Sequence, residues 1–207
     1  MPDSVPAADI LLREDRGAVS ILTLNRPAAR NPLSEAMLAA LASTLDAIAV
    51  DSSIRAVVLK AEGKAFSAGH DLKEVQANRN REYYNWLLKE CAGVMKRIVH
   101  LPQPVIAAVE GIATAAGCQL VASCDIAFAS NEALFATPGV NIGLFCSTPM
   151  VALSRNVAPK HAMEMLLSGG LMDANHAMRI GLINKVTPVG ETRATAFAFA
   201  ESVASRS

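Results

Sequence analysis

The sequence predicts an α/β protein in which short strands alternate with helices. Short apolar runs of the size of buried strands recur along the chain, and they indicate strands of a covered sheet. Segments whose apolar residues recur at helical spacing lie between them. Strands followed by a helix, repeated in this way, predict a right-handed superhelix of sheets with the helices outside. Because no internal sequence repeat is visible, the prediction rests on the order of the elements.

The first half of the chain is expected to hold a hairpin, a strand and two long helices. The runs 10–14 and 18–24 meet at Arg16-Gly17 and predict a β-hairpin. Ser34 can cap a helix that ends near Asp51. A strand over 55–61 and a helix over 81–100 follow. The apolar face of the first helix is expected to comprise Met37, Leu38, Leu41, Leu45 and Ile48.

The second half is expected to hold shorter elements. Strands over 104–109 and 126–129 enclose a small buried helix that begins near Ala115. Thr148-Pro149 is a good helix start, since proline fits the first helical position. The other expected elements are a strand over 134–136, helices over 159–168 and 173–180, a strand over 182–186 and a helix from 191 onward.

Composition limits the classes of function. A chain of 207 residues is most simply one domain, 1–207, with a strand-and-helix core over about 1–190 and the start of a C-terminal helical region over 191–207. Nineteen basic residues balance nineteen acidic ones. The formal net charge of zero offers no electrostatic footprint for nucleic acid or an anionic membrane surface. We therefore expect neither partner.

The cysteines and the N-terminus predict a cytoplasmic protein. The four cysteines show no C-x-x-C spacing, so reduced thiols are expected rather than disulfides or a zinc site. Residues 1–16 carry four acidic residues and no long apolar run, so neither a secretory signal nor a transit peptide is expected there.

The stretch from Pro104 to Asp125 places a buried strand before a helix made of small residues. Ala115, Ala116 and Gly117 stand where this helix begins. The first N–H groups of a helix have no partner within it and carry the positive end of its dipole. Small residues at the helix start let a ligand oxygen come close to these N–H groups, which can then stabilise negative charge on that oxygen. The alternative is a small-residue helix packed tightly in a core.

A second stretch, Lys64 to Lys73, again leads from a strand through small residues to an expected helix start at Asp71. The segments KAFSAGHDLK and GIATAAGCQLVASCD together resemble the two signature regions of the crotonase superfamily, the enoyl-CoA hydratases and isomerases. Leu24–Pro27, Phe135–Pro138 and Asn141–Gly143 fit the same pattern, so the resemblance covers nearly the whole chain.

This resemblance implies a crotonase-like right-handed ββα superhelix whose usual C-terminal helices are cut short here. It implies a homotrimer or hexamer that takes an acyl-CoA thioester, with coenzyme A as part of the substrate and no other cofactor. The backbone N–H groups of His70 and Ala116 would form an oxyanion hole for the thioester carbonyl. For Lys64 and Lys73 a solvated surface lysine is the alternative. The expected contacts to CoA are Arg26, Lys64, Ala68, His70, Asp71, Leu72, Lys73 and Ala116.

Two positions depart from the hydratase pattern. Members of the family place a glutamate at each of two positions that here hold Gln119 and Gly139. An amide can orient a water molecule but cannot take its proton, and losing a positioned acid or base costs about 10²–10⁴ in rate. Gln119, Gly139 and the run GLFCSTP resemble a subgroup described as enoyl-CoA hydratase domain-containing proteins.

Cys146 is a further catalytic candidate by resemblance. It aligns with the position at which the naphthoate synthase branch carries a catalytic aspartate, and a place just before a helix can lower a thiol pKa. The alternative is a small buried core thiol. Ser147 and Thr148 are interpreted as helix caps, and His70 as a backbone donor first and a side-chain acid second. His100, His161 and His176 show no metal-ligand spacing, so no metal site is expected.

These features support two hypotheses of function. The first is an enzyme that acts on an acyl- or enoyl-CoA through the oxyanion hole. It would nominally be a 2-enoyl-CoA hydratase, a lyase of fatty acid metabolism, with weak hydration because Gln119 and Gly139 replace the two glutamates. The second is a catalytically silent acyl-CoA-binding or regulatory subunit. A purely structural protein that forms oligomers is the remaining alternative.

Overall fold

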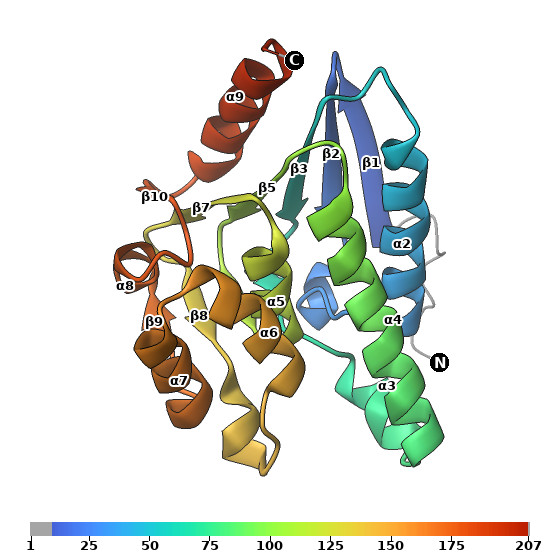
Figure 1. Cartoon of the computed structure of the whole chain (residues 1–207), viewed down its shortest axis with the longest axis vertical. Helices are drawn as coiled ribbons and strands as arrows, with labels where there is room; N and C mark the ends of the chain where they lie inside the picture. The colour runs from blue at the N-terminus through green and yellow to red at the C-terminus, as the bar shows by residue number, and fades with distance from the viewer. Residues whose placement is uncertain (1–9, 207) are drawn as a thin grey trace.

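The computed structural model describes residues 10–206, and their strands form two sheets (Figure 1). The six-stranded sheet has the order β1-β2-β3-β5-β7-β10 and the four-stranded sheet the order β4-β6-β8-β9. Three successive strand pairs, from β3/β4 to β7/β8, each give one strand to either sheet. This repeat confirms the α/β superhelix that the element order predicts. The strands are β1 (Leu11–Arg16), β2 (Val19–Leu24), β3 (Ala56–Ala61), β4 (Ala65–Ser67), β5 (Val105–Val109), β6 (Ile112–Thr114), β7 (Ile126–Ser130), β8 (Leu134–Ala136), β9 (Met172–Asp173) and β10 (Lys185–Thr187).

The strands within the two sheets run parallel except at two edges. The hairpin β1–β2 and the pair β8–β9 are antiparallel. The helices are α2 (Glu35–Ala49), α3 (Leu72–Ala77), α4 (Arg81–His100), α5 (Ala116–Ser123), α6 (Ser147–Asn156), α7 (Pro159–Ser168), α8 (Ala174–Arg179) and α9 (Thr192–Ala204), with the 3-10 turns η1 (Pro27–Ala29) and η2 (Pro138–Ile142).

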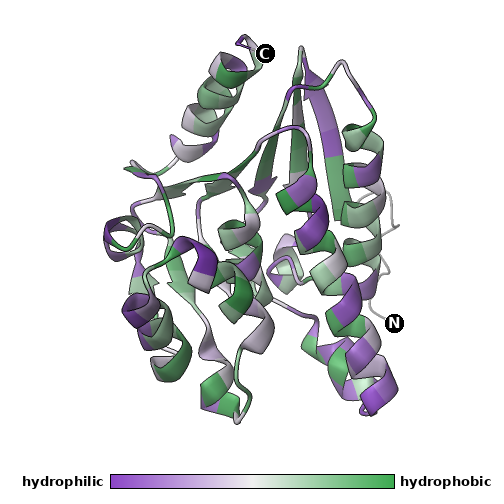
Figure 2. Ribbon diagram, viewed as in Figure 1, coloured by the Kyte–Doolittle hydropathy of each residue, from purple (hydrophilic) through white to green (hydrophobic). Residues whose placement is uncertain are grey.

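Helix α2 shows how local sequence decides local structure. The Ser34 side chain accepts a hydrogen bond from the Met37 N–H at 3.3 Å and so caps the helix. The apolar face predicted from the spacing is the buried face. Helix α5 lies in the middle of the fold and is buried along its whole length. Figure 2 shows α5 as largely hydrophobic and β1 as largely hydrophilic.

Helix α9 covers the opposite face of the large sheet from α2 and α4 (Figure 1). Alternate residues of a strand point to opposite faces. On β3, Val57 therefore joins the main core and Val58 joins a second cluster with Ala196 and Ala200 of α9. The main hydrophobic core thus fills the space between the two sheets and the helices that pack against them.

Several element boundaries differ from the prediction. Strand β10 begins at Lys185 instead of 182. Asn184, just before it, donates its N–H to the Ala127 carbonyl at 2.7 Å and accepts the Ala127 N–H through its side-chain Oδ1 at 2.8 Å. Helix α6 begins at Ser147, with Cys146 as its N-cap residue and no side-chain capping bond. Ser147 and Thr148 lie inside α6, so their interpretation as caps was wrong.

Candidate functional site

The two signature segments lie against each other along their length. Strand β4 of the first pairs in parallel with β6 of the second, and the Thr114 hydroxyl donates to the Ala68 carbonyl at 3.3 Å. Glycine is needed at the contact: a Cβ on Gly117 would overlap the carbonyl oxygen of Ser67 and lie 2.8 Å from the Ser67 Cβ. The start of α5 therefore touches the backbone at the end of β4.

The backbone N–H of His70 faces this contact. The Leu33 N–H donates to the Gly69 carbonyl at 2.8 Å, and Leu33 and His70 form a parallel bridge. In such a bridge the middle residue turns its own N–H away from the partner. The His70 N–H therefore points away from Leu33, to the side on which α5 begins.

The N–H of Ala116 is turned toward the same place. The Ala115 N–H donates to the Ala136 carbonyl at 2.9 Å, but Ala115 has φ 51° and ψ −121°, which takes the next peptide out of the strand direction. A Cβ on Gly69, which has φ 91°, would lie 3.2 Å from the Ala116 nitrogen. Within residues 10–206, neither the His70 nor the Ala116 amide takes part in the backbone hydrogen bonds that join these loops. Their arrangement fits an oxyanion hole, and a residue held at positive φ beside it is the strain expected of such a site.

Gln119 lies one helical turn beyond Ala116, so the two residues share a face of α5. Its side chain is 5% exposed. Its Oε1 atom is buried and has no hydrogen-bond partner among the described residues. A buried acceptor without a partner costs free energy, which a bound water or ligand donor can recover.

The position of the second family glutamate is filled. A Cβ on Gly139 would overlap the Leu144 carbonyl oxygen and lie 2.8 Å from the Cys146 Sγ. Cys146 is buried in the main core and so fits the core-thiol alternative, while its sulfur also borders this position. A side chain larger than hydrogen at 139 therefore requires the 144–146 backbone to move.

The imidazole of His70 is mostly buried, and burial lowers its pKa below the usual 6.5, although the Leu33 backbone partly offsets the shift. Neither ring nitrogen has a partner in hydrogen-bonding geometry among the described residues. Because burial lowers its pKa, the ring is uncharged at neutral pH.

The expected CoA contacts fall into two groups. Arg26 and Asp71 are brought together, with 3.5 Å between Nη1 and Oδ2. The Asp71 carboxylate also caps α3 by accepting the Lys73 N–H at 3.1 Å. Lys64, Leu72 and Lys73 are exposed, and Ala68 is half-buried, with its N–H donating to the Arg30 carbonyl at 3.1 Å. Their contact with CoA stays a prediction.

Asn31 is a positioning residue that the sequence analysis did not single out. It is fully buried. Its Oδ1 accepts the Arg26 N–H at 2.7 Å, and its Nδ2 donates to the carbonyls of Glu62 (2.8 Å) and Ala65 (2.7 Å). One amide thus fixes the segment of Arg26 relative to the first signature loop. A buried, fully satisfied amide of this kind leaves no periodic signal in sequence.

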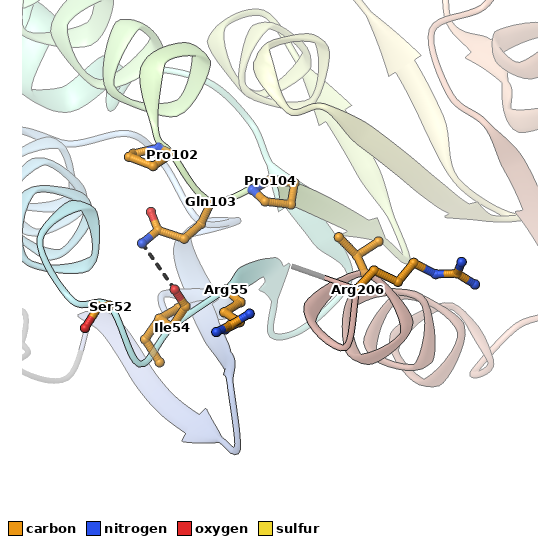
Figure 3. A pocket seen from close by; sticks show the side chains of 8 residues that line it. Ser52, Ile54, Arg55, Pro102, Gln103, Pro104 and Arg206 are labelled. Carbon is orange, nitrogen blue, oxygen red and sulfur yellow. Dashed lines mark hydrogen bonds between the residues drawn. The ribbon is translucent and has the colours of Figure 1, made fainter.

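A pocket also lies away from the signature loops. A pocket of about 510 Å³ lies between the loops at 52–55 and 102–104 and the end of α9. The Gln103 amide donates to the Ile54 carbonyl at 3.2 Å, and the side chains of Arg55 and Arg206 do not point toward each other (Figure 3). Because no reactive groups converge there, we place the candidate site at the two signature loops.

Comparison with known proteins identifies the class. The enoyl-CoA hydratase/isomerase family model matches residues 14–207, and the chain belongs to this family. Its fold is that of the crotonases: the crystal structure of an enoyl-CoA hydratase from Mycobacterium smegmatis, 54% identical, superposes with a TM-score of 0.92 over 94% of this chain and 76% of that one. The resemblance to the crotonase superfamily is confirmed.

The comparisons also point to the subgroup. The chain is 46% identical over 206 residues to enoyl-CoA hydratase domain-containing protein 3, mitochondrial, of Rattus norvegicus, covering 100% of this chain and 68% of that protein. The corresponding Homo sapiens protein is 48% identical over 186 residues, covering 90% and 61%. The human protein's crystal structure superposes with a TM-score of 0.91 at 45% identity, covering 95% of this chain and 78% of that one. The chain thus spans about three fifths to two thirds of the length of these curated relatives.

These relatives correct one expectation. The expectation of a cytoplasmic protein was wrong, because the rat, mouse and human relatives are named as mitochondrial proteins. No helix within residues 10–206 is both long and apolar enough to cross a membrane.

Proposed function

We propose that the protein binds an acyl- or enoyl-CoA thioester and holds its carbonyl oxygen between the N–H groups of His70 and Ala116. The observation that carries this proposal is the approach of Gly69 to the Ala116 nitrogen, which brings the two amides to one place. CoA would be part of the substrate, with no further cofactor. Since the family typically oligomerises, we propose a homotrimer, which light scattering can test.

The chemistry follows from the two donors. Each N–H aimed at a thioester oxygen that becomes negative contributes about 3 kcal/mol to the transition state. An enolate or a tetrahedral adduct would be stabilised in this way. Gln119 would orient water or substrate through its unpaired amide oxygen. Both family glutamates, which transfer the protons of ordinary hydration, are absent. We therefore propose a hydratase-like lyase with weak hydration.

The second function is a silent acyl-CoA-binding or regulatory subunit. It is favoured by the closed position at Gly139, where the Leu144 carbonyl and the Cys146 sulfur occupy the space of a second carboxylate. Binding would then be retained without turnover.

Crotonyl-CoA consumption at high protein concentration tests the proposal. The wild type is compared with Gln119→Glu, and Gln76→Glu on the exposed face of α3 serves as the matched control. We expect slow hydration by the wild type and by Gln76→Glu. Gln119→Glu should be faster by about 10²-fold or more, because it restores one acid or base.

The other outcomes separate the hypotheses. Wild-type hydration as fast as that of Gln119→Glu would show that another group transfers the proton. Acyl-CoA binding by all three proteins without product would favour the silent subunit. Absence of acyl-CoA binding to the wild type, measured by calorimetry, would refute both functions.

A further inference from the structure

We infer a divalent transition-metal site formed by His161, Glu164 and His176, apart from the acyl-CoA site. Each of these residues offers one ligand atom, and the three atoms lie within 4.8 Å of one another. The His161 Nδ1 and Glu164 Oε2 atoms are 3.6 Å apart. The rings of His161 and His176 are perpendicular, with centroids 6.3 Å apart.

The backbone already holds these side chains in place. His161 and Glu164 lie one turn apart on α7, so they project from the same face. His176 is in the first turn of α8, where its N–H donates to the capping carboxylate of Asp173 at 2.7 Å. Two ligands thus come from one rigid helix and the third from the capped start of another. The 15-residue interval between the histidines explains why spacing alone predicted no metal site.

The ligand set selects the kind of metal. Imidazole nitrogen binds Zn²⁺ at about 2.0–2.1 Å, so neighbouring ligand atoms of a tetrahedral ion lie about 3.3 Å apart. The His161–Glu164 distance of 3.6 Å is close to that value, and the His176 ligand atom, within 4.8 Å of the other two, would have to move closer by at most about 1.5 Å. Two imidazoles and one carboxylate suit Zn²⁺, Cu²⁺, Ni²⁺ or Co²⁺, whereas Mg²⁺ and Ca²⁺ require mainly oxygen ligands. The fourth position of a tetrahedral ion would hold water.

A bound ion would cross-link α7 and α8. The Thr137 hydroxyl donates to the Met165 carbonyl of α7 at 3.0 Å, and Asn141 donates to the Gly169 carbonyl at 3.4 Å. Helix α7 therefore holds the η2 segment that carries Gly139. We expect metal binding to raise the melting temperature, because the ion binds the folded arrangement and no such site exists in the unfolded chain.

Zinc titration by calorimetry of the whole chain, with any histidine tag removed, tests the site. We expect one equivalent of Zn²⁺ to bind and Mg²⁺ not to bind. His161→Ala, Glu164→Gln and His176→Ala should each weaken zinc binding at least tenfold, since even outer-shell changes at metal sites cost about 10–100-fold. His100→Ala, an exposed histidine at the end of α4, is the matched control and should bind as the wild type does.

Melting curves without zinc verify that each variant folds, so a loss of binding cannot come from misfolding. The melting temperature of the wild type and of His100→Ala should rise with zinc, while that of the three site variants should not. Equal zinc binding by the wild type and by both histidine variants would overturn the inference, as would no saturable binding by the wild type. Neither result depends on acyl-CoA, so failure of this site and failure of the proposed function are distinguishable.

Discussion

Gly117→Ala should separate the two signature loops without unfolding the protein. The added methyl would overlap the Ser67 carbonyl oxygen and lie 2.8 Å from the carbonyl carbon and the Cβ of Ser67. The neighbour is mostly backbone, so no flexible side chain can turn aside. Carbon atoms in contact prefer about 3.5–4.0 Å, so the start of α5 has to move away from β4 by roughly 1 Å.

The size of the effect follows from this movement. The N–H of Ala116 is carried by the residue that precedes Gly117, so it shifts relative to the N–H of His70. A misplacement of about 1 Å in a reacting geometry can cost 10²-fold. Overpacking itself destabilises by about 1–3 kcal/mol, which a domain of this size can tolerate.

The assay compares crotonyl-CoA turnover, acyl-CoA binding and urea unfolding for Gly117→Ala and Gly170→Ala. A Cβ on Gly170 meets only the Ser168 hydroxyl at 3.5 Å, an ordinary contact, so this variant is the matched control. We expect crotonyl-CoA turnover up to about 10²-fold slower and acyl-CoA binding weaker for Gly117→Ala, and both unchanged for the control. If folded Gly117→Ala binds acyl-CoA as tightly as the wild type, the signature loops do not form the binding site.

Three further predictions concern stability and reactivity. Leu45→Ala should lower the free energy of unfolding in urea by about 2–5 kcal/mol, because Leu45 is 1% exposed, whereas Val50→Ala, at an 86% exposed position, should change it by less than about 0.5 kcal/mol. Burial raises the pKa of Cys91 and of Cys118 to about 12. Neither thiol should therefore react with a thiol reagent at pH 8 until urea unfolds the chain. Labelling of the native protein at these positions would contradict their burial. Burial lowers the pKa of His70 below 6.5, so as the pH falls below 6.5 the unfolded chain binds a proton before the folded chain does. The free energy of unfolding should therefore fall with acidification, and it should fall less in His70→Gln. Equal pH profiles for the two proteins would contradict this shift.

Local pattern was sufficient for the long helices. The five apolar residues on one face of α2 are its buried residues, and α4 spans 81–100 as its spacing predicts. Both helices are specified by contacts three and four residues apart, which a sequence displays directly.

The short strands β4 and β6 were not predicted, although β8, of the same length, was. Strands β4 and β6 have three residues each and exist because Ala65 pairs with Ile112. Nothing within three residues reveals such a pairing, since sheet stability comes from cross-strand neighbours. The site depends on this missed pair, because β4 and β6 set the two signature loops side by side.

The two departures from the hydratase pattern, at positions 119 and 139, differ in kind, and this difference is visible in the structure and not in the sequence. At 119 the side chain keeps the length of a glutamate and its oxygen is buried without a partner among the described residues, so a carboxylate can replace the amide in the same space. At 139 the space itself is gone, because the Leu144 carbonyl and the Cys146 sulfur stand where a Cβ would begin. A glutamate there cannot be accommodated by side-chain rotation and requires the 144–146 backbone to refold. The proposed site therefore has room for one new carboxylate beside the proposed oxyanion hole, while the opposite position offers only a carbonyl and a thiol.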